Sequence, residues 1–583
     1  MTRHSQLVYS LALVLALAVV GCAGSDAVSV PGDAGPRSDA GRDTGPATDG
    51  PLAQEDATTP QDDAAPADAA PQQDAALHQD APLQQDAALQ QDTAAQQDAT
   101  QQDAAQQDAT QQDATQQDAT QQDATVTTRT ITGTSIAHRQ WDTGSADEPD
   151  DLSAASVMAL VANGASYTTY AGTGDATGHF TIPNVPVGPY LLFAGDGYYY
   201  RMATDTPNLD YYVRGRPAIA TTSSATNLVF NVTNLSAYHQ NGDDVLYYSS
   251  NTDAYDTIAY TGAQPTEGAT TLSKTYDLNG ASASNVLATT ADHPILIDYV
   301  GTGTATTYVA TAARSFSPAP YAQANGASQN VSGAFATIAS TTTTGVSWFR
   351  SEFHGGTVIA DIGPSAAFDL EFSIITAQPG GLTHGVFASG VDLAQLYGDS
   401  TTSNLDSGNV TYGNPFDGSW EQYLFTLVRA KFPVTAPGAT APATVYGWVR
   451  TMETRASSMS VHMLVSPPRA LQINGQAASA NLTGVTTSPT LSWTAPATGT
   501  ATTYQVYVYR VSNSAGSTAR AAVAAFYTDQ TSVKVPAGLL SAGTSYQFRV
   551  MAISDPNANY AVAPWLTGLP HGDATAFTAL ATP

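Results

Sequence analysis

Apolar and polar residues alternate along much of the chain with the two-residue period of a β-strand. In residues 368–374 an apolar set of Phe, Leu, Phe and Ile alternates with Asp, Glu and Ser. Because successive side chains of a strand point to opposite faces, this segment predicts a strand with one packed face and one face in solvent. A second alternating set, Tyr546, Phe548, Val550 and Ala552, predicts another strand with an inward apolar face.

The same period recurs through most of the chain, between turns rich in Gly, Pro, Asn and Asp. Further predicted strands are Thr130–Thr132, Val157–Val161, Ile295–Val300, Thr306–Ala312, Val346–Phe353, Tyr423–Phe432, Val445–Met452 and Ser460–Val465. Only Val391–Tyr397 favours a helix. The sequence therefore predicts an all-β protein, with several β-sandwich domains in tandem behind a disordered low-complexity linker.

The N-terminus has the pattern of a secretory signal. A short basic start precedes an apolar stretch over residues 7–20, which is too short for a stable spanning helix. The run Val19-Val20-Gly21-Cys22 resembles the lipobox of bacterial lipoproteins. This resemblance implies a signal peptide over residues 1–21 and lipidation of the Cys22 thiol. An ordinary signal peptide that happens to contain a cysteine is the alternative.

Residues 22–126 form a low-complexity linker of Gln, Asp, Ala, Thr, Pro and Gly. No aromatic residue lies between Tyr9 and Trp141, and residues 25–125 carry 20 acidic side chains against two arginines. Such a composition cannot offset the entropy of ordering, so we expect a disordered, self-repelling tether spanning about 55 Å. A partial helix is the alternative, although aspartates recurring every six and then every five residues leave no apolar stripe.

Residues 127–236 contain a Gly-x-Phe strand at Gly178–Phe180, a Val-Pro-x-Gly-x-Tyr turn over residues 185–190 and a later Gly197-Tyr198. These motifs resemble the carboxypeptidase regulatory-like, or prealbumin-like, β-sandwich, which implies an accessory, non-catalytic module. An acidic stretch over residues 142–151 interrupts the pattern. We interpret it as a solvated loop, with a calcium site as the alternative.

Residues 467–583 contain Trp493 in a predicted second strand, Tyr504 opening a third, and a Leu-x-x-Gly-Thr-x-Tyr corner ending at Tyr546. This combination resembles a fibronectin type III domain. The resemblance implies packing roles for Trp493 and Tyr504, and a hydrogen bond from the Tyr546 phenol to backbone upstream.

Residues 237–466 form a β-rich segment that resembles no family. Two constellations there could meet through the fold: His293 with Asp298, and Ser351 with Glu352 and His354. Surface positions are the simpler interpretation of both. Paired carboxylates for glycoside hydrolysis remain open in this segment, because such groups need only converge in space. Exposed Tyr and Trp side chains could also form a sugar-stacking platform, at no particular place.

Charge and motifs exclude several classes of function. Acidic side chains outnumber basic ones by 50 to 20, which disfavours nucleic acid as a partner. A single cysteine excludes internal disulfides and Cys-built metal sites. Sequence motifs of hydrolases, zinc proteases, P-loops, dinucleotide-binding folds and EF-hands are missing. We predict no catalytic residue, no cofactor and no bound metal.

These observations favour a lipid-anchored cell-envelope protein that displays β-sandwich modules for interaction or adhesion, without catalysis. We expect it in the bacterial outer membrane, because Ala23 follows Cys22. We also expect its folded part to be exposed at the cell surface. A membrane, through the anchor, is one partner, and a surface glycan or a protein is another candidate. The alternative is an extracellular carbohydrate-active or peptidase-like enzyme with its active site in residues 237–466.

Overall fold

The computed structural model describes residues 127–583, except 218, 241, 260–263, 281–285, 287–291, 305–306, 381–389 and 399–402. The predicted signal peptide (residues 1–21), Cys22 and the predicted linker (22–126) lie outside the described residues. All described residues belong to one compact unit. They are almost entirely in strands, which confirms the all-β prediction.

The predicted first segment contributes strands that begin and end near its glycine and proline turns. These strands are β1 (Thr128–Thr134), β2 (Ile136–Trp141), β3 (Gly144–Pro149), β4 (Met158–Asn163), β5 (Ser166–Ala171), β6 (Thr173–Gly174), β7 (His179–Pro186), β8 (Tyr190–Phe193), β9 (Tyr198–Met202), β10 (Tyr211–Arg214) and β11 (Asn227–Thr233). Phe180 and Ile182, two residues apart on β7, are both buried. The alternation there directs one face of the strand into the core.

The middle segment contains most of the long strands. Its elements are β12 (Asp244–Ser249), β13 (Ala254–Thr257), β14 (Thr271–Asp277), η1 (Leu278–Gly280), β15 (Ile295–Thr304), β16 (Thr307–Phe316), β17 (Ser328–Ala334), β18 (Ala336–Thr337), β19 (Thr341–Trp348), α2 (Arg350–His354), α3 (Val358–Ile362), β20 (Ala367–Pro379), β21 (Val391–Gly398), β22 (Leu405–Gly413), β23 (Trp420–Val434), β24 (Ala443–Thr454) and β25 (Ser458–Val461). Strands β20, β23 and β24 are antiparallel neighbours in that order.

The C-terminal segment forms two layers. Its strands are β26 (Arg469–Ile473), β27 (Gln476–Ala477), β28 (Leu482–Thr483), β29 (Thr490–Thr494), β30 (Thr503–Ser514), β31 (Ser517–Thr528), β32 (Ser532–Lys534), β33 (Ser545–Ser554), β34 (His571–Phe577) and β35 (Ala581–Thr582). One layer has the order β27-β26-β29-β32. In the other, β30 lies between β31 and β33, and β33 pairs with β34.

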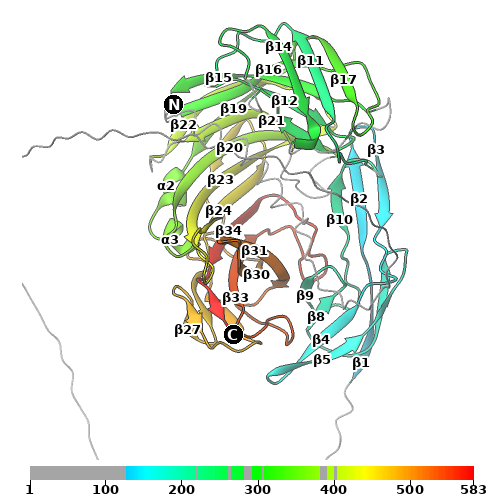
Figure 1. Cartoon of the computed structure of the whole chain (residues 1–583), viewed down its shortest axis with the longest axis vertical. Coiled ribbons are helices and arrows are strands. Elements are labelled where there is room, and N and C mark those ends of the chain that lie inside the picture. Colours follow the sequence, from blue (N-terminus) through cyan, green and yellow to red (C-terminus); the bar gives the residue numbers. More distant parts are fainter. Residues whose placement is uncertain are drawn as a thin grey trace, which may run out of the picture. The chain divides into compact units, whose positions relative to one another are not determined.

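Strand pairing continues across the predicted segment boundaries (Figure 1). Strand β34 pairs with β24, joining residues 571–574 to residues 449–452. Strand β31 pairs in parallel with β9 through residues 525–527 and 198–200. Strand β11, at the end of the first segment, pairs with β14 and β17 of the middle segment. Among the described residues, one hydrogen-bonded sheet of 19 strands spans all three segments, whereas β11, β14 and β17 form a separate three-stranded sheet.

The layer containing β30, β31 and β33 is buried on both faces. Val506 and Phe548 face one apolar cluster. This cluster also contains Trp493 of the same segment and Val428 of the middle segment. Tyr507 and Met551 face a second cluster, built largely from residues of β4, β7, β8 and β9. The C-terminal layer therefore provides a wall of both cores, and burial on each side stabilises it by the removal of apolar surface from water.

The corner expected from the fibronectin type III resemblance is present. The backbone N–H of Ser541 donates to the phenol oxygen of Tyr546 at 2.9 Å, which confirms a bond between this side chain and backbone upstream. Trp493 and Tyr504 pack edge to face with ring centroids 5.1 Å apart. Both rings are buried, as packing roles require.

The prediction of a helix over Val391–Tyr397 is wrong, because these residues form strand β21. This strand lies between β16 and β20 and is hydrogen-bonded to both. Leu393 and Leu396 are fully buried there. A short helix is only marginally stable alone, so the pairing available on either side decides the conformation.

The prediction of a solvent-exposed face for β20 is also wrong. The alternating residues do form a strand, but Glu371 is 2% exposed and Ser373 is fully buried. Glu371 accepts hydrogen bonds from Arg350 of α2 and from His354 at 2.7 Å. The strand predicted over Val346–Phe353 ends at Trp348, and the helix α2 begins at Arg350. This helix supplies the cation that makes a buried carboxylate tolerable.

The acidic stretch over residues 142–151 is a hairpin arm where a solvated loop was predicted. Its centre is β3, paired with β2. Asp147 contacts His138 at 2.7 Å, Glu148 binds Arg139, and Asp150 accepts from Ser135 at 2.7 Å. Asp147, Glu148 and Asp150 thus each have a side-chain partner among residues 135–139, in or directly before β2.

Candidate functional site

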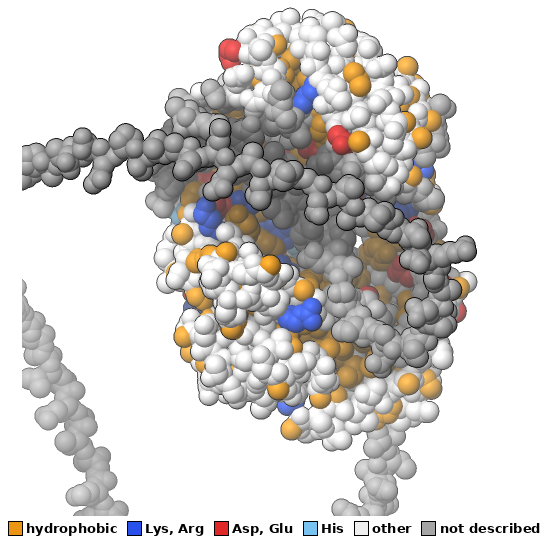
Figure 2. All heavy atoms as spheres, in the orientation of Figure 1, with side chains coloured by type: hydrophobic (Ala, Val, Ile, Leu, Met, Phe, Trp, Pro, Cys, Tyr) orange, Lys and Arg blue, Asp and Glu red, His pale blue; other side chains and the backbone are white. Residues whose placement is uncertain are grey.

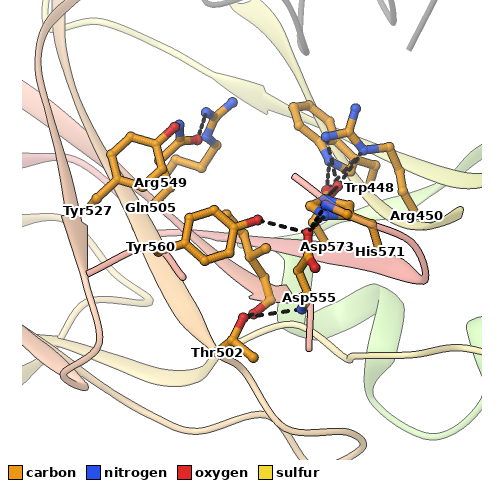
Figure 3. A network of polar contacts seen from close by, with 12 residues as sticks. Trp448, Arg450, Thr502, Gln505, Tyr527, Arg549, Asp555, Tyr560, His571 and Asp573 are labelled. Atoms are coloured by element: carbon orange, nitrogen blue, oxygen red, sulfur yellow. Dashed lines mark hydrogen bonds and ion pairs between the residues drawn. The ribbon is translucent and has the colours of Figure 1, made fainter. Parts of the chain in front are cut away.

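Five side chains form a charged cluster at the junction of β24, β33 and β34. His571 Nδ1 lies 3.2 Å from Asp555 Oδ2, and its Nε2 lies 3.5 Å from Asp573 Oδ2. Asp573 also accepts from the Trp448 indole at 2.6 Å and from Arg450 Nη2 at 2.8 Å. Figure 3 shows these groups converging on Asp573 and Asp555. Residues from the middle and C-terminal segments are therefore fixed to one another by charge.

The two aspartates favour the protonated form of the His571 imidazole. Burial alone would lower the pKa of His571, but its hydrogen bonds to Asp555 and Asp573 outweigh burial and raise it. Burial raises the pKa of Asp573, but the charge of Arg450 and the bonds from His571 lower it to about 2. Burial also raises the pKa of Asp555, but the hydrogen bonds from His571 and Gly568 outweigh burial and lower it. Each shift favours the charged form of its group, so the cluster is an ion network.

Asp555 also shapes the segment that follows β33. Its carboxylate accepts from the backbone N–H of Gly568 at 2.7 Å and of Asn557 at 3.2 Å. Asn557 Nδ2 in turn donates to the carbonyl of Leu569 at 2.6 Å. These bonds draw the two ends of residues 555–569 together. The segment is therefore a closed loop with a defined conformation, attached to the buried cluster.

An open groove lies beside this loop. Its lining comes from residues 420–422 of β23, from Thr454 and Arg455 at the end of β24, and from parts of residues 557–569. The volume of the groove is about 880 Å³. Volumes of this size are typical of small-molecule sites.

Trp420 provides the aromatic surface of the groove. Phe416 stacks on its ring, with centroids 3.9 Å apart and planes 10° apart. The ring of Tyr248 lies T-shaped to that of Trp420, with centroids 5.9 Å apart. Trp420 is half-buried, so these two neighbours fix its orientation while part of the ring lines the groove.

Polar side chains of the groove are held by bonds that use only part of their hydrogen-bonding capacity. Gln422 Oε1 accepts from the Tyr412 phenol at 2.7 Å, so its amide nitrogen is oriented away from that bond. Arg455 donates through Nε to Thr344 at 2.8 Å and through Nη2 to the Thr343 carbonyl at 2.7 Å. Because an amide and a guanidinium carry further donors, these side chains present preorganised groups to a ligand.

The two constellations that the sequence left open are not assembled. The surface positions preferred for them are wrong for Asp298, which is buried, and for His354, whose side chain is 5% exposed. Ser351 binds Asn404 through its backbone N–H at 3.1 Å. Glu352 accepts from His462 Nδ1 at 2.8 Å and from the Met463 backbone at 3.0 Å, whereas His354 binds Glu371. These three neighbours in sequence therefore have different partners and form no shared site.

His293 and Asp298 also have different surroundings. His293 is exposed, whereas Asp298 is buried and accepts from the Ser236 backbone at 2.9 Å. Burial is the main cause that raises the pKa of Asp298. In the part of the chain that the structure describes, no group of His, Cys, Asp or Glu has an arrangement that could hold a metal ion. No helix among these residues is long and apolar enough to cross a membrane.

The groove and the cluster were missed by sequence reasoning. Their residues come from residues 420–455 and from residues 555–573, which begin 100 residues further along the chain, and none belongs to a motif. The available signals were the aromatic pair Phe416 and Trp420 flanking a turn, and the polar run from Asp555 to Asn559 after a strand. Neither signal indicates that the segment around Trp420 and the segment after Asp555 lie side by side.

The described residues define an all-β protein with an open groove at the junction of its middle and C-terminal strands. No family model and no curated protein matches the chain. The chain is similar to the solved FN1-FN3 domains of chicken CNTN1, at 11% identity and a TM-score of 0.12, over 63% of this chain and 98% of that chain.

Two further solved structures are similar at the same level. A segment of consecutive domains from titin is 12% identical, with a TM-score of 0.12, over 62% of this chain and 97% of that chain. A tetra-tandem repeat from the extending region of a large adhesion protein is 12% identical, with a TM-score of 0.09, over 76% of this chain and 99% of that chain. The fold assignment rests on the strands and their pairing alone.

Proposed function

We propose that this chain is a lipid-anchored cell-envelope protein that binds a ligand in the groove beside Trp420 and performs no catalysis. The groove is the observation that carries the proposal. It combines an oriented aromatic ring with amide and guanidinium groups already fixed by neighbours. Prior fixing lowers the ordering cost of binding.

The two aspartates of the charged cluster, which do not line the groove, are already bound within the fold. Asp555 and Asp573 are engaged with His571, Arg450 and backbone N–H groups. A general acid or base must reach the reacting group of a substrate. The engagement of these carboxylates in an ion network favours a supporting role for them, beneath a binding surface.

Anchoring is proposed from the N-terminal residues. Cys22 would carry the acyl chains, and stable attachment to a membrane needs more than one chain. We place the protein in the bacterial outer membrane, with its folded part at the surface and the acidic linker as a tether. These inferences rest on the resemblance of residues 19–22 to a lipobox.

The modules named from sequence are also part of the proposal. The Tyr546 corner and the strand orders β27-β26-β29-β32 and β31-β30-β33-β34 support a fibronectin type III module in residues 467–583. The buried Phe180, Ile182 and Tyr190 support a carboxypeptidase regulatory-like module in residues 127–236. Such modules serve display and interaction.

Incubation of the full chain with glycan and peptide panels tests this function, with retention and product release both measured. Retention without release of products is the expected result. Turnover that is lost on Glu421→Gln or on another change in the groove would replace the proposal with the enzyme alternative. Absence of retention on both panels would remove the binding role altogether.

A further inference from the structure

We propose that the groove binds an oligosaccharide of neutral pyranose sugars, with Trp420 as the ring on which a sugar stacks. This inference rests on the proposed binding function of the same groove. It identifies the ligand by three properties of the lining: its aromatic surface, its amide groups and its balance of charge.

The aromatic surface is the first property. The C–H face of a pyranose ring is apolar and flat, and it packs against the π face of an indole. The Trp420 ring lines the groove, while Phe416, which does not line it, stacks on one face of this ring, and Tyr248 lies T-shaped to it. A ring fixed in this way loses little freedom when a ligand covers it, so more of the contact energy remains as affinity.

The amide groups are the second property. Gln422, Asn557 and Asn559 line the groove together with Trp420. Carboxamides both donate and accept hydrogen bonds, as do the hydroxyl groups of a sugar. Gln422 Oε1 is engaged by Tyr412 and Asn557 Nδ2 by the Leu569 carbonyl. One residue therefore presents donors and the other presents an acceptor, in fixed directions.

The charge of the lining is the third property. It contains one acidic residue, Glu421, and one basic residue, Arg455. A polyanionic ligand would favour several Lys or Arg side chains. On the face shown in Figure 2, the charged side chains of the described residues are scattered and form no single field of either sign. A neutral ligand fits this balance.

A peptide fits the groove less well. Extended peptides commonly bind by adding a strand to an unpaired sheet edge. Strand β23, which carries Trp420 and Gln422, is paired with β20 on one side and β24 on the other. Its backbone groups are used within the sheet, so recognition along this strand must come from side chains.

The test uses the full chain and defined saccharides. Pull-down with microcrystalline cellulose, chitin and insoluble xylan is followed by tryptophan fluorescence titration with the soluble hexasaccharides of the same polymers. We expect retention on at least one polymer, and an affinity about tenfold or more lower for Trp420→Ala, as for truncation of a central aromatic contact. Asn559→Ala changes an exposed residue of the groove lining and should weaken binding about threefold. This second variant tests the location of the site if the Trp420 variant fails to fold.

Tyr446→Ala is the matched control, because Tyr446 is a half-buried aromatic residue on β24 that packs on Arg429 outside the groove. Its affinity for the hexasaccharide should equal that of the unmodified chain. Saccharide binding unaffected by both groove variants would overturn the location. Retention of peptides alone, lost in Trp420→Ala, would refute the saccharide while leaving the binding function intact. Retention of neither class would refute both, and cleavage of a bound saccharide would refute only the absence of catalysis.

Discussion

His571 Nδ1 lies 3.2 Å from Asp555 Oδ2, and both side chains are buried where β34 begins and β33 ends. The same imidazole approaches Asp573 with its other nitrogen, at 3.5 Å. One ring therefore connects the loop that borders the groove to the strand that joins the middle and C-terminal segments. A change in the charge of the His571 ring should therefore alter both the free energy of unfolding and the conformation of the loop beside the groove.

Stability should decline with rising pH because of His571. Its pKa is raised by Asp555 and Asp573 against the effect of burial, so the folded chain holds the proton more tightly than the unfolded chain does. The resulting stabilisation is complete below the ordinary histidine pKa of about 6.5. It is lost as pH rises through the raised pKa of the folded state.

Denaturant unfolding between about pH 6 and about pH 9 measures this dependence. The decline in unfolding free energy should be smaller in His571→Gln than in the unmodified chain. His293→Gln, at an exposed histidine, should retain the full decline. Parallel curves for the His571 variant and the unmodified chain would contradict the charge assignment.

Asp573→Asn should destabilise the fold by about 3–5 kcal/mol, because it leaves Arg450 and His571 buried without their countercharge. The Asp573 side chain is 0% exposed, and its pKa is lowered to about 2, chiefly by Arg450 against the opposing effect of burial. Thermal and denaturant unfolding give the change in free energy.

Asp529→Asn serves as the control for Asp573, since Asp529 pairs with Arg201 at a site where its side chain is 52% exposed. An exposed pair of this kind contributes at most about 1 kcal/mol. Equal losses in the two variants would show that the buried network is no stronger than a surface pair.

Tyr546→Phe should cost about 1 kcal/mol, the usual contribution of one intramolecular hydrogen bond. The change removes only the oxygen that accepts from the Ser541 backbone at 2.9 Å and keeps the buried ring. Tyr509→Phe, at a half-buried tyrosine of the same layer, should change stability by less than about 0.5 kcal/mol. If the two substitutions have the same effect, the corner does not stabilise the connection.

Cys22→Ser should release the protein from membranes into the soluble fraction, because serine provides no thiol for acylation. Detergent partitioning and labelling with a radioactive fatty acid measure the outcome. Ser25→Ala, three residues away, should leave membrane attachment unchanged. Retention of the Cys22 variant in the detergent phase would refute the lipid anchor.

Sequence patterns predicted the strands correctly where contacts between residues close in the chain determine the conformation. Phe180 and Ile182 alternate in sequence and are both buried, and the Tyr546 corner was predicted with its hydrogen bond. The same reasoning failed for Glu371, whose polarity indicates solvent although the residue is buried against Arg350. A sequence pattern shows which residues alternate, but it cannot show that a helix will cover the polar face.

The groove illustrates a second limit. Trp420, Arg455 and Asn557 are far apart in sequence, and the groove exists only because β34 pairs with β24 and places the loop after Asp555 beside β23. That pairing depends on a register of backbone hydrogen bonds between residues 449–452 and 571–574. No single segment encodes this register by itself.

By itself, the sequence determined the strand content, the corner at Tyr546 and the inward sets of several strands, because period-two alternation and turn residues act over a few neighbours. Only the tertiary structure decided which faces meet. The strand containing Tyr546 alternates in sequence, yet both of its faces are buried, since cores from different segments pack on either side. Burial of the second face depends on long-range pairing, which local periodicity does not specify.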